Sequence, residues 1–394
     1  MNFVITRRRV CRLMWLALLS LMLVVTGCTL TPKKEPSRAE KKDVSAADLV
    51  QQVGWRDLPG WNEDDPLALL KTFVVSCQSL KYRSGWQAVC EEAATIETPA
   101  AARVFFERSF QPWALINEDG TEEGLITGYY VPDLEGSRQS SSRYPYPVYG
   151  RPDDLLVIDL SSVYPELGDY RLRGRLDGQR VVPYWERRDI DGFKQPLHGE
   201  ELFWVGDPVE LFFLQVQGSG RINLDDGTQV MVNYAEQNGH PYRSIGALLL
   251  ERGEMTRDQM SMQNIAAWGR QHPVAVQELL NENPSYVFFR ELDGEVCSPP
   301  GALGVPLSSR RSLAVDPRYI PLGAPVYVAT RWPDRNEPLQ QAMVAQDTGG
   351  AIKGRVRADF FWGIGDEAGA MAGRMKYSGR LWLLLPLGME PPAR

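Results

Sequence analysis

Three aspartates in the last third of the chain could carry acid–base chemistry. Asp316 ends the run S-L-A-V-D, Asp347 ends M-V-A-Q-D, and Asp359 precedes F-F-W. An aspartate that ends a strand and enters a glycine turn can be held in a cleft, partly out of water, with a raised pKa. The glycines between Asp347 and Asp359 would let the backbone approach a bulky ligand closely. The segment therefore favours proton transfer by these acids, with the capping of turn amides as the ordinary alternative for each.

Other common catalytic patterns are poorly supported. The three histidines, His198, His240 and His272, form no H-E-x-x-H arrangement, and the chain has no G-x-S-x-G nucleophile elbow. The run G-I-G-D-E-A formally matches a dinucleotide fingerprint, but an acid would face the pyrophosphate and too little chain follows to complete the unit. No metal and no organic cofactor is indicated.

Aromatic residues and a polar turn suggest a sugar ligand. The chain holds 11 Trp, 15 Tyr and 13 Phe, and the pair Tyr129–Tyr130 lies beside a glycine in a predicted strand. Aromatic faces suit sugar rings, although most aromatic side chains in any protein belong to its core. The run Q-V-Q-G-S-G-R, residues 215–221, is either a second ligand-contacting turn or a simple hairpin.

The first 27 residues have the pattern of an export signal. Four arginines precede an apolar run that ends in V-T-G-C, residues 25–28. This ending resembles a bacterial lipobox, which implies cleavage before Cys28 and acylation of that residue. Residues 28–45 are polar and charged, so we expect a flexible tether. Resemblance to Gram-negative lipoproteins, with Thr29 after the cysteine, implies the periplasmic face of the outer membrane.

Export and net charge limit the partners and the cysteine chemistry. The formal net charge of −7 gives no attraction to nucleic acid. Cys77 and Cys90 lie close in sequence, and an exported chain could join them in a disulfide, the alternative being two reduced core thiols. Cys297 is then left over, and we expect a buried free thiol.

The pattern of apolar residues predicts a mainly β fold with helical additions. Residues 46–115 have helical spacing, with Thr98 as an N-cap and Pro99 in the first helical position. Strands are expected from Gly124, and residues 144–235 alternate short apolar runs with turns. Helices are expected over 244–253, 256–272 and 274–281, followed by short strands. A second β-rich unit inserted in a larger one fits this order.

Several of these segments together resemble the membrane-bound lytic murein transglycosylase A family, whose C-terminal part carries a 3D, or three-aspartate, region. The resemblance covers T-G-Y-Y (127–130), L-Q-V-Q-G-S-G (214–220), A-V-D-P-R-Y-I-P-L-G (314–323), D-T-G-G-A-I-K-G (347–354) and R-A-D-F-F-W-G-I-G (357–365). It implies a double-psi β-barrel built from residues 46–131 and 247–394, with a smaller β domain inserted at 132–246 and a groove between the two.

The resemblance also implies an activity and a set of site residues. The family cleaves the bond between N-acetylmuramic acid and N-acetylglucosamine in peptidoglycan strands and leaves a 1,6-anhydro end. Murein synthases or scaffold proteins would be further partners. Asp359 matches the catalytic acid/base, with Asp347 and Asp316 as the other two acids. The expected substrate-binding residues are Thr127, Tyr129, Tyr130, Gln217, Gly218, Ser219, Gly220 and Lys353.

Two other functions stay open on the residues alone. A hydrolytic glycosidase would use Asp359 with Asp347 or Asp316 and a water molecule. An expansin-like protein would bind the wall polymer without cleaving it. Lytic cleavage needs only one protein acid, because the sugar's own C6 hydroxyl can serve as the nucleophile.

Overall fold

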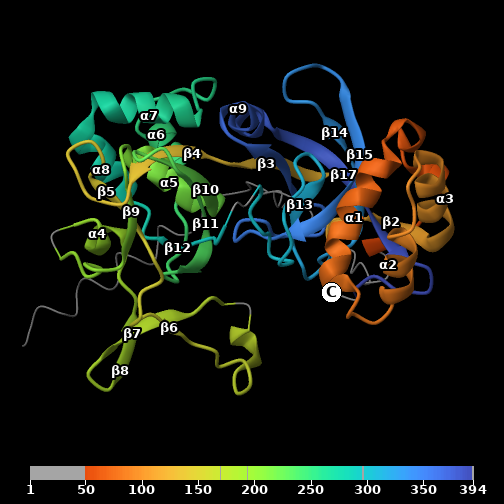
Figure 1. The fold of residues 1–394 in the computed structure, drawn as a ribbon, viewed down its shortest axis with the longest axis horizontal. Coiled ribbons are helices and arrows are strands. Elements are labelled where there is room, and N and C mark those ends of the chain that lie inside the picture. Colours follow the sequence, from red (N-terminus) through yellow and green to blue (C-terminus); the bar gives the residue numbers. More distant parts are fainter. Residues whose placement is uncertain (1–48, 169, 193, 295–296, 393–394) are drawn as a thin grey trace, which may run out of the picture. The chain divides into compact units, whose positions relative to one another are not determined.

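The computed structural model describes residues 49–392 except 169, 193 and 295–296 (Figure 1). The expected signal peptide, the tether and Cys28 lie outside the described residues. Within the described ranges, no helix combines the length and the apolar character needed to cross a membrane.

One sheet has eight strands, and six of them close into a ring. Its order is β1-β2-β17-β14-β15-β13-β16-β3, and β17 also pairs with β3. In sheet order the strands are β1 (Val50–Gln52), β2 (Phe110–Leu115), β17 (Lys376–Pro386), β14 (Pro325–Arg331), β15 (Pro338–Asp347), β13 (Ser312–Val315), β16 (Ala358–Ile364) and β3 (Gly124–Val131). Because β17 pairs with both β14 and β3, the strands from β17 round to β3 form a closed barrel. The predicted mainly β fold with helical additions is confirmed.

Three helices near the start of the described chain pack on this barrel: α1 (Pro66–Leu80), α2 (Gln87–Ala93) and α3 (Pro99–Ser109). As predicted, α3 begins with Thr98 as its N-cap, whose hydroxyl accepts the N–H of Ala101, and with Pro99 in the first turn. Helix α1 begins in the same way at Asp65 and Pro66. Phenylalanines of α1, α3 and β2 form one buried aromatic cluster with the barrel core.

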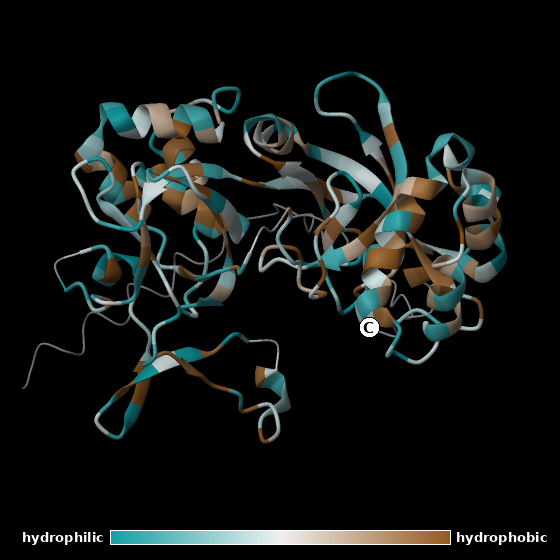
Figure 2. Ribbon diagram, viewed as in Figure 1, coloured by the Kyte–Doolittle hydropathy of each residue, from teal (hydrophilic) through white to brown (hydrophobic). Residues whose placement is uncertain are grey.

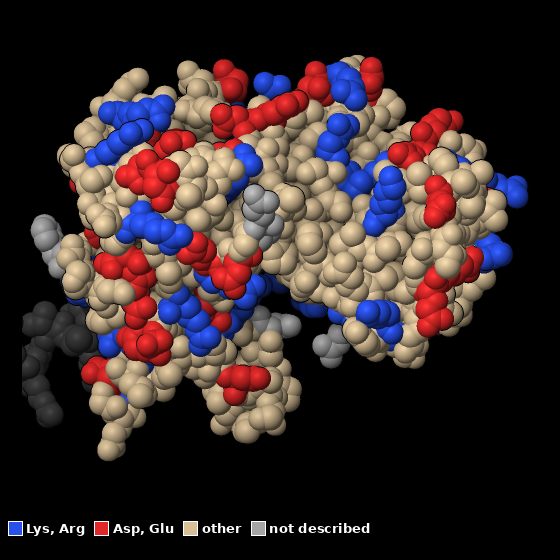
Figure 3. Space-filling view, viewed as in Figure 1, with Lys and Arg blue, Asp and Glu red and all other residues tan. Residues whose placement is uncertain are grey.

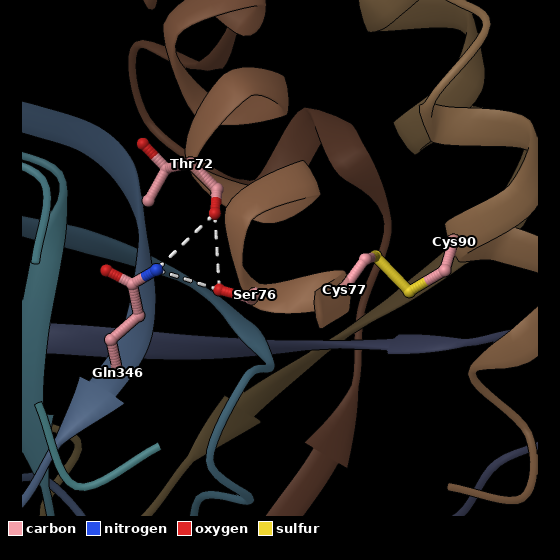
Figure 4. The surroundings of a disulfide bond; sticks show 5 residues. All are labelled: Thr72, Ser76, Cys77, Cys90 and Gln346. Carbon is pink, nitrogen blue, oxygen red and sulfur yellow. Dashed lines mark hydrogen bonds between the residues drawn. A yellow bond between two sulfur atoms is a disulfide. The ribbon is translucent and has the colours of Figure 1, made fainter. Parts of the chain in front are cut away.

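Helix α1 is attached to both α2 and β15 (Figure 4). A disulfide joins Cys77 of α1 to Cys90 of α2. On the opposite side of α1, the side-chain amide of Gln346 donates to the Ser76 hydroxyl at 2.9 Å and to the Thr72 carbonyl at 3.4 Å. Gln346 is fully buried, so the end of β15 is fixed from inside the fold.

The chain between β3 and β13 builds a second sheet with helices on it. The order of its strands is β12-β11-β10-β4-β9-β5. They are β4 (Asp133–Ser137), β5 (Tyr146–Tyr149), β9 (Glu201–Val205), β10 (Ser219–Leu224), β11 (Gln229–Gln237) and β12 (Val287–Glu291). The helices are α4 (Arg187–Ile190), α5 (Pro208–Gln217), α6 (Ile245–Glu251), α7 (Met262–Gln271) and α8 (Pro273–Asn281).

This unit extends further along the chain than the expected end at residue 246. Residues of α5 to α8 share one apolar cluster, which includes Phe212, Leu249 and Leu279. Strand β12 then pairs with β11 in the same sheet. The stretch up to Glu291 therefore packs with the inserted sheet, because the apolar faces of α6 to α8 are buried against α5.

Two other expectations are wrong. Helix α5 lies inside the 144–235 stretch expected to be β, and it begins with Asp207 as N-cap and Pro208 in the first turn. Cys297, expected to be buried, is exposed.

A three-stranded sheet extends from the inserted unit as an arm (Figures 1 and 2). It consists of β6 (Leu156–Val157), β7 (Arg173–Asp177) and β8 (Arg180–Pro183). The arm exposes apolar residues such as Val157, Leu176 and Val181. On the face drawn in Figure 3, acidic and basic side chains are interspersed, so this face carries no extended surface of one sign.

The remaining helix, α9 (Asp366–Arg374), follows β16 and packs on β3 and β16. It crosses β3 at Gly128, where an added Cβ would lie 2.7 Å from the indole nitrogen of Trp362 and 2.9 Å from the Cα of Ala372. Glycine at this position is what allows the helix and the strand to approach each other.

Candidate active site

Strand register brings two of the three predicted aspartates to one face of the barrel. Asp359 of β16 lies opposite Thr127 of β3 on one side and opposite Ala314 of β13 on the other. Ala314 is also aligned with Asp347, the last residue of β15. Paired residues point to the same face of a sheet. The two carboxylates therefore share a face with β13 between them, at a Cα separation of roughly 10 Å from two strand spacings.

Side-chain alternation divides the aromatic residues after Asp359 between two environments. Phe360 and Trp362 belong to the barrel core. Phe361 lies on the face of the acid and contacts Tyr129, with ring centroids 5.1 Å apart. The aspartate face thus has an apolar floor, although only one of the three aromatic residues in F-F-W contributes to it.

Asp359 is held by a chain of two hydrogen bonds. The Thr127 hydroxyl donates to Oδ1 of Asp359 at 2.7 Å, and Nη2 of Arg357 donates to the Thr127 oxygen at 2.8 Å. Burial raises the pKa of Asp359 above its ordinary value, while the Thr127 hydrogen bond and the Arg357 charge act in the opposite direction. The net result is a partly buried carboxyl group that holds its proton to higher pH than a free aspartate does.

Asp347 is also shifted towards its neutral form. Its Oδ1 accepts the backbone N–H groups of Ala302 at 3.0 Å and Thr348 at 2.9 Å. Burial, together with the negative charge of Asp359, outweighs these donors and raises the pKa of Asp347 to about 6. Two acids with raised pKa values on one face are typical of a site that handles protons.

Tyr129 lies close to both acids. Its hydroxyl is buried and forms no hydrogen bond of normal geometry in the described part of the chain, but it lies close enough to Asp347 to lower the pKa of that acid. Burial and the charges of Asp347 and Asp359 raise the pKa of Tyr129 well above its ordinary value. The tyrosine therefore remains a neutral hydrogen-bond donor that faces two carboxyl groups.

Asp316 has a different environment. Its side chain is fully buried, and it accepts hydrogen bonds from Nη2 of Arg318 at 2.7 Å and from the backbone N–H of Gly354 at 2.9 Å. Burial would raise the pKa of Asp316, but these hydrogen bonds and the Arg318 charge lower it below its ordinary value. Asp316 is therefore an ionised residue that joins the end of β13 to the loop before β16.

The Gln217–Gly220 segment connects α5 to β10 and is not a hairpin turn. Gln217 ends α5, and its side-chain oxygen accepts the backbone N–H of Tyr130 at 3.2 Å. Gly218 adopts the left-handed conformation, with φ 79°, that ends the helix. Gly220 fits against Leu214, where a Cβ would lie 2.3 Å from a methyl carbon.

Ser219 is linked to the aspartate face through one asparagine. The side-chain amide of Asn233 donates to the Ser219 hydroxyl at 2.8 Å and lies 3.3 Å from the carbonyl of Pro300. The same loop supplies the Ala302 N–H that binds Asp347. The predicted polar turn is therefore connected to Asp347 through Asn233 and the loop from Pro300 to Ala302.

Two expected binding residues do not join this group. Tyr130 points to the other side of β3, where its hydroxyl lies 2.8 Å from the sulfur of Met262 and its ring packs against Gly369. Lys353 is exposed in the loop between β15 and β16. Arg357, which the sequence reading missed, lies beside Asp359 instead. Arg357 directly precedes β16 and lies two residues before the acid, and that spacing is the signal that alternation offers in the sequence.

The described residues hold no cluster of three or more His, Cys, Asp or Glu side chains arranged to bind a metal ion. The candidate site consists of two carboxyl groups with raised pKa values, a neutral tyrosine, and an arginine whose guanidinium donates to the threonine that binds Asp359.

Comparison with known proteins first defines a class. Residues 125–290 match the family model of the MltA specific insert domain, and residues 311–385 match that of the 3D domain. The insert match ends at residue 290, within β12, in agreement with the packing of α6 to α8 on the inserted sheet. The chain is thus a 3D-domain protein that carries this insert.

Relatives and solved structures then define the family. The membrane-bound lytic murein transglycosylase A of Escherichia coli K12 is 34% identical over 279 residues, which cover 69% of this chain and 68% of that protein. The crystal structure of MltA from Neisseria gonorrhoeae is similar with a TM-score of 0.77 and 42% identity, over 87% of this chain and 94% of that one. E. coli MltA with bound chitohexaose gives a TM-score of 0.63 and 28% identity, over 88% and 97%. The chain belongs to the membrane-bound lytic murein transglycosylase A family, as the sequence resemblance implied.

Proposed function

We propose that this protein is a peptidoglycan-degrading lytic transglycosylase that uses Asp359 as its single acid/base. It would cleave the β-1,4 bond between N-acetylmuramic acid and N-acetylglucosamine and leave a 1,6-anhydromuramic end. The observation that carries the proposal is the Asp359 carboxyl group, whose pKa burial raises above its ordinary value and which accepts a hydrogen bond from the Thr127 hydroxyl. Membership of the family supports the reaction, and the chitohexaose bound to the E. coli relative supports a β-1,4-linked glycan as ligand.

In the first half of the reaction, protonated Asp359 would donate its proton to the glycosidic oxygen as the bond from C1 to that oxygen breaks. Positive charge then develops on C1 and the ring oxygen of the muramic residue. The ionised form of Asp347, on the same face, would stabilise that charge. Because the pKa of Asp347 is about 6, this form is the major one at neutral pH.

In the second half, the C6 hydroxyl of the same sugar attacks C1 and gives its proton to the Asp359 carboxylate. The acid regains its starting form and no water is consumed. Attack within one sugar avoids the entropic cost of placing a water molecule. Thr127 favours the carboxylate that exists between the two halves, since its hydrogen bond lowers the pKa of Asp359.

Product analysis of digested peptidoglycan sacculi tests the proposal. Wild-type protein in ¹⁸O-labelled water is expected to release muropeptides with anhydro ends, one water lighter than hydrolysed ones and free of label. Asp359→Asn, which keeps the shape of the side chain, is expected to lower the rate by about 10³-fold or more. Label at the reducing ends would instead support a hydrolase that uses Asp359 and Asp347. Unchanged effects on the sacculus in the variant would support a non-catalytic wall-binding protein.

For location, we propose lipid anchoring at Cys28 on the periplasmic face of the outer membrane. The lipobox-like V-T-G-C sequence and the description of the relatives as membrane-bound support this proposal. Cys28→Ser is expected to move the protein from the membrane fraction to the soluble fraction. Equal membrane association of the two forms would contradict the anchor.

A further inference from the structure

The inserted unit contains a cavity that is separate from the aspartate face. Its volume is about 230 Å³, and it lies among β5, α4, α5 and α8. The residues that line it include Tyr146, Tyr149, Arg187, Asp191, Gln277 and Leu280. No residue of the proposed catalytic machinery lines this cavity.

Hydrogen bonds hold one edge of the Arg187 guanidinium group in place. The side chain is 3% exposed. Its Nε donates to the Asn283 carbonyl at 3.2 Å, and its Nη2 donates to the Ser285 carbonyl at 2.7 Å and to Oε1 of Gln215. Nη1 is the remaining nitrogen. It faces Oδ2 of Asp191 at 3.7 Å, which is longer than a hydrogen bond.

Asp191 is the second charge of the cavity. Its side chain is 21% exposed. Burial raises the pKa of Asp191, and the Arg187 charge lowers it. The hydroxyl of Tyr286, whose ring lies under the Arg187 guanidinium, is buried and forms no hydrogen bond of normal geometry in the described part of the chain, but it lies close enough to Asp191 to lower the pKa of that acid. At 3.7 Å the contact between Nη1 of Arg187 and Oδ2 of Asp191 is longer than a normal hydrogen bond, so each of the two charges can form a closer contact with a charged ligand.

The rest of the cavity fits a short aliphatic group. Tyr146 and Tyr149 form one wall, and Leu211 and Leu280 form apolar surface from α5 and α8. At about 230 Å³ the cavity is smaller than the roughly 300–1,000 Å³ of ordinary small-molecule sites. It would hold roughly eight water molecules, which is the size of an amino acid and too small for a disaccharide.

The rim contains strained backbone. Gln195 lines the cavity with φ 40°, in the left-handed region that residues other than glycine seldom adopt. Such strain persists only where the surrounding structure imposes it, and it collects at ligand-holding sites. The Gln195 and Gln277 side chains supply amide groups at this opening.

We propose that this cavity binds the head group of an α-amino acid, with its carboxylate on Nη1 of Arg187 and its ammonium on Asp191. The two charges of such a head group are joined through one carbon, so they can lie side by side along the Nη1–Oδ2 pair, each against its opposite. The aliphatic chain then lies between the tyrosines and the leucines. This arrangement gives Nη1 of Arg187 and Oδ2 of Asp191 each a closer partner than the 3.7 Å contact between them.

The head group could come from a free amino acid or from the stem peptide of peptidoglycan, and the second source rests on the proposed function. Helix α5 connects the two sites. Its first turns line the cavity at Pro208 and Leu211, and its last residue, Gln217, binds the backbone of β3. The ten residues of α5 span about 15 Å, so a bound stem peptide would lie about one helix length from the strand that carries Thr127.

Calorimetry on the full chain tests the proposal, with meso-diaminopimelate as probe because it carries an amino-acid head group at each end of an aliphatic chain. Wild-type protein is expected to bind it, and to bind cadaverine (amines only) and pimelate (carboxylates only) about tenfold more weakly or worse. Equal binding of all three would overturn the proposal, and so would no binding of the probe. This comparison uses wild-type protein alone, so it does not depend on the folding of any variant.

Asp191→Asn is expected to lose about tenfold or more in affinity for the probe. Asp177→Asn, on the exposed arm, serves as a control with the same change of charge and should leave binding unchanged. Circular dichroism confirms that both variants fold. Equal affinity of Asp191→Asn and wild type for the probe would contradict the proposed contact between the ammonium group and Asp191.

Binding measurements with Asp359→Asn protein then distinguish the two sources of the head group. If the stem peptide is the ligand, a disaccharide-tripeptide binds better than the same disaccharide without peptide, and this difference disappears in Asp191→Asn. Binding of the free amino acid alone identifies the other source. Anhydro products from wild-type protein that binds no probe would leave the proposed function intact and remove only this inference.

Discussion

The Thr127 hydroxyl and the Asp359 carboxylate meet across the parallel strands β3 and β16, 2.7 Å apart, although 232 positions separate them in the chain. The whole inserted unit lies between them in sequence. The proton-transferring group is therefore oriented by a residue from the opposite end of the described chain, and Arg357 completes the contact from beside the acid.

Replacement of Thr127 by valine should change both the rate and its pH dependence. The hydrogen bond favours the carboxylate, so its loss raises the pKa of Asp359. The alkaline limb of the kcat/KM profile, which reports loss of the acidic proton, should then move to higher pH. We also expect kcat to fall about tenfold, because the acid loses its fixed orientation.

Thr127→Ser is the matched control for this experiment, since it keeps a hydroxyl at the same position. Its pH profile should stay close to that of wild type. A valine variant whose alkaline limb coincides with that of the serine variant would show that the hydrogen bond does not set the titration of Asp359.

Asp347 should lower the stability of the folded protein at neutral pH. Its pKa is raised to about 6 from an ordinary 3.8, so between these values the folded protein holds a proton that the unfolded chain has lost. The free energy of unfolding therefore falls as pH rises through this window, by at most about 3 kcal/mol. Asp347→Asn removes the titration and keeps an oxygen for the two N–H donors. We expect it to exceed wild type by about 1–3 kcal/mol at pH 7 and to match it near pH 4, as measured by urea unfolding.

Asp316→Asn is expected to change the free energy of unfolding in the opposite direction in the same assay. Arg318 and Gly354 hold the pKa of Asp316 below its ordinary value. Its contribution to stability is therefore present above the unfolded pKa and is lost as pH falls through the folded one. The variant should be less stable than wild type at pH 7, with a smaller difference in acid. A shift of the same sign for both aspartates would contradict their different environments.

The disulfide between Cys77 and Cys90 should stabilise the protein against thermal unfolding. It closes a loop with a sequence separation of 13 residues, and loops of this length stabilise by about 3 kcal/mol. The double variant Cys77→Ser/Cys90→Ser should have a lower Tm than wild type, and a reductant should lower the Tm of wild type to the same value. Cys297→Ser, at an exposed position, should change neither. A reductant effect that persists in the double variant would argue against this disulfide as the source.

Local signals predicted much of the fold. The Thr98–Pro99 start of α3 follows from capping chemistry that involves only neighbouring residues. The Asp207–Pro208 start of α5 has the same signal, but it lies in the 144–235 stretch that is expected to be β, because periodicity does not separate short helices from strands. The end of the inserted unit depended on which sheet covers α6 to α8, and that is a long-range property.

The same distinction between local and long-range signals applies to the residues of the candidate site. Asp347 and Asp359 were predicted from their types and neighbours, and the register places them on one face. Asp316 looked equivalent in sequence, yet its charge is taken up by Arg318, and such pairing depends on the conformation of the turn. Tyr129 and Tyr130 could not both face the acids, because adjacent strand residues point in opposite directions.

The closing of the barrel by β17 determines when the site can exist. This last strand pairs with both β14 and β3, so the ring that carries Asp359 stays open until residues near the C-terminus have been synthesised. A nascent chain that lacks them cannot close the barrel beside β3. On the proposed function, an enzyme that cuts the cell wall would thus be inactive throughout its own synthesis, and loss of the final strand by proteolysis would switch it off.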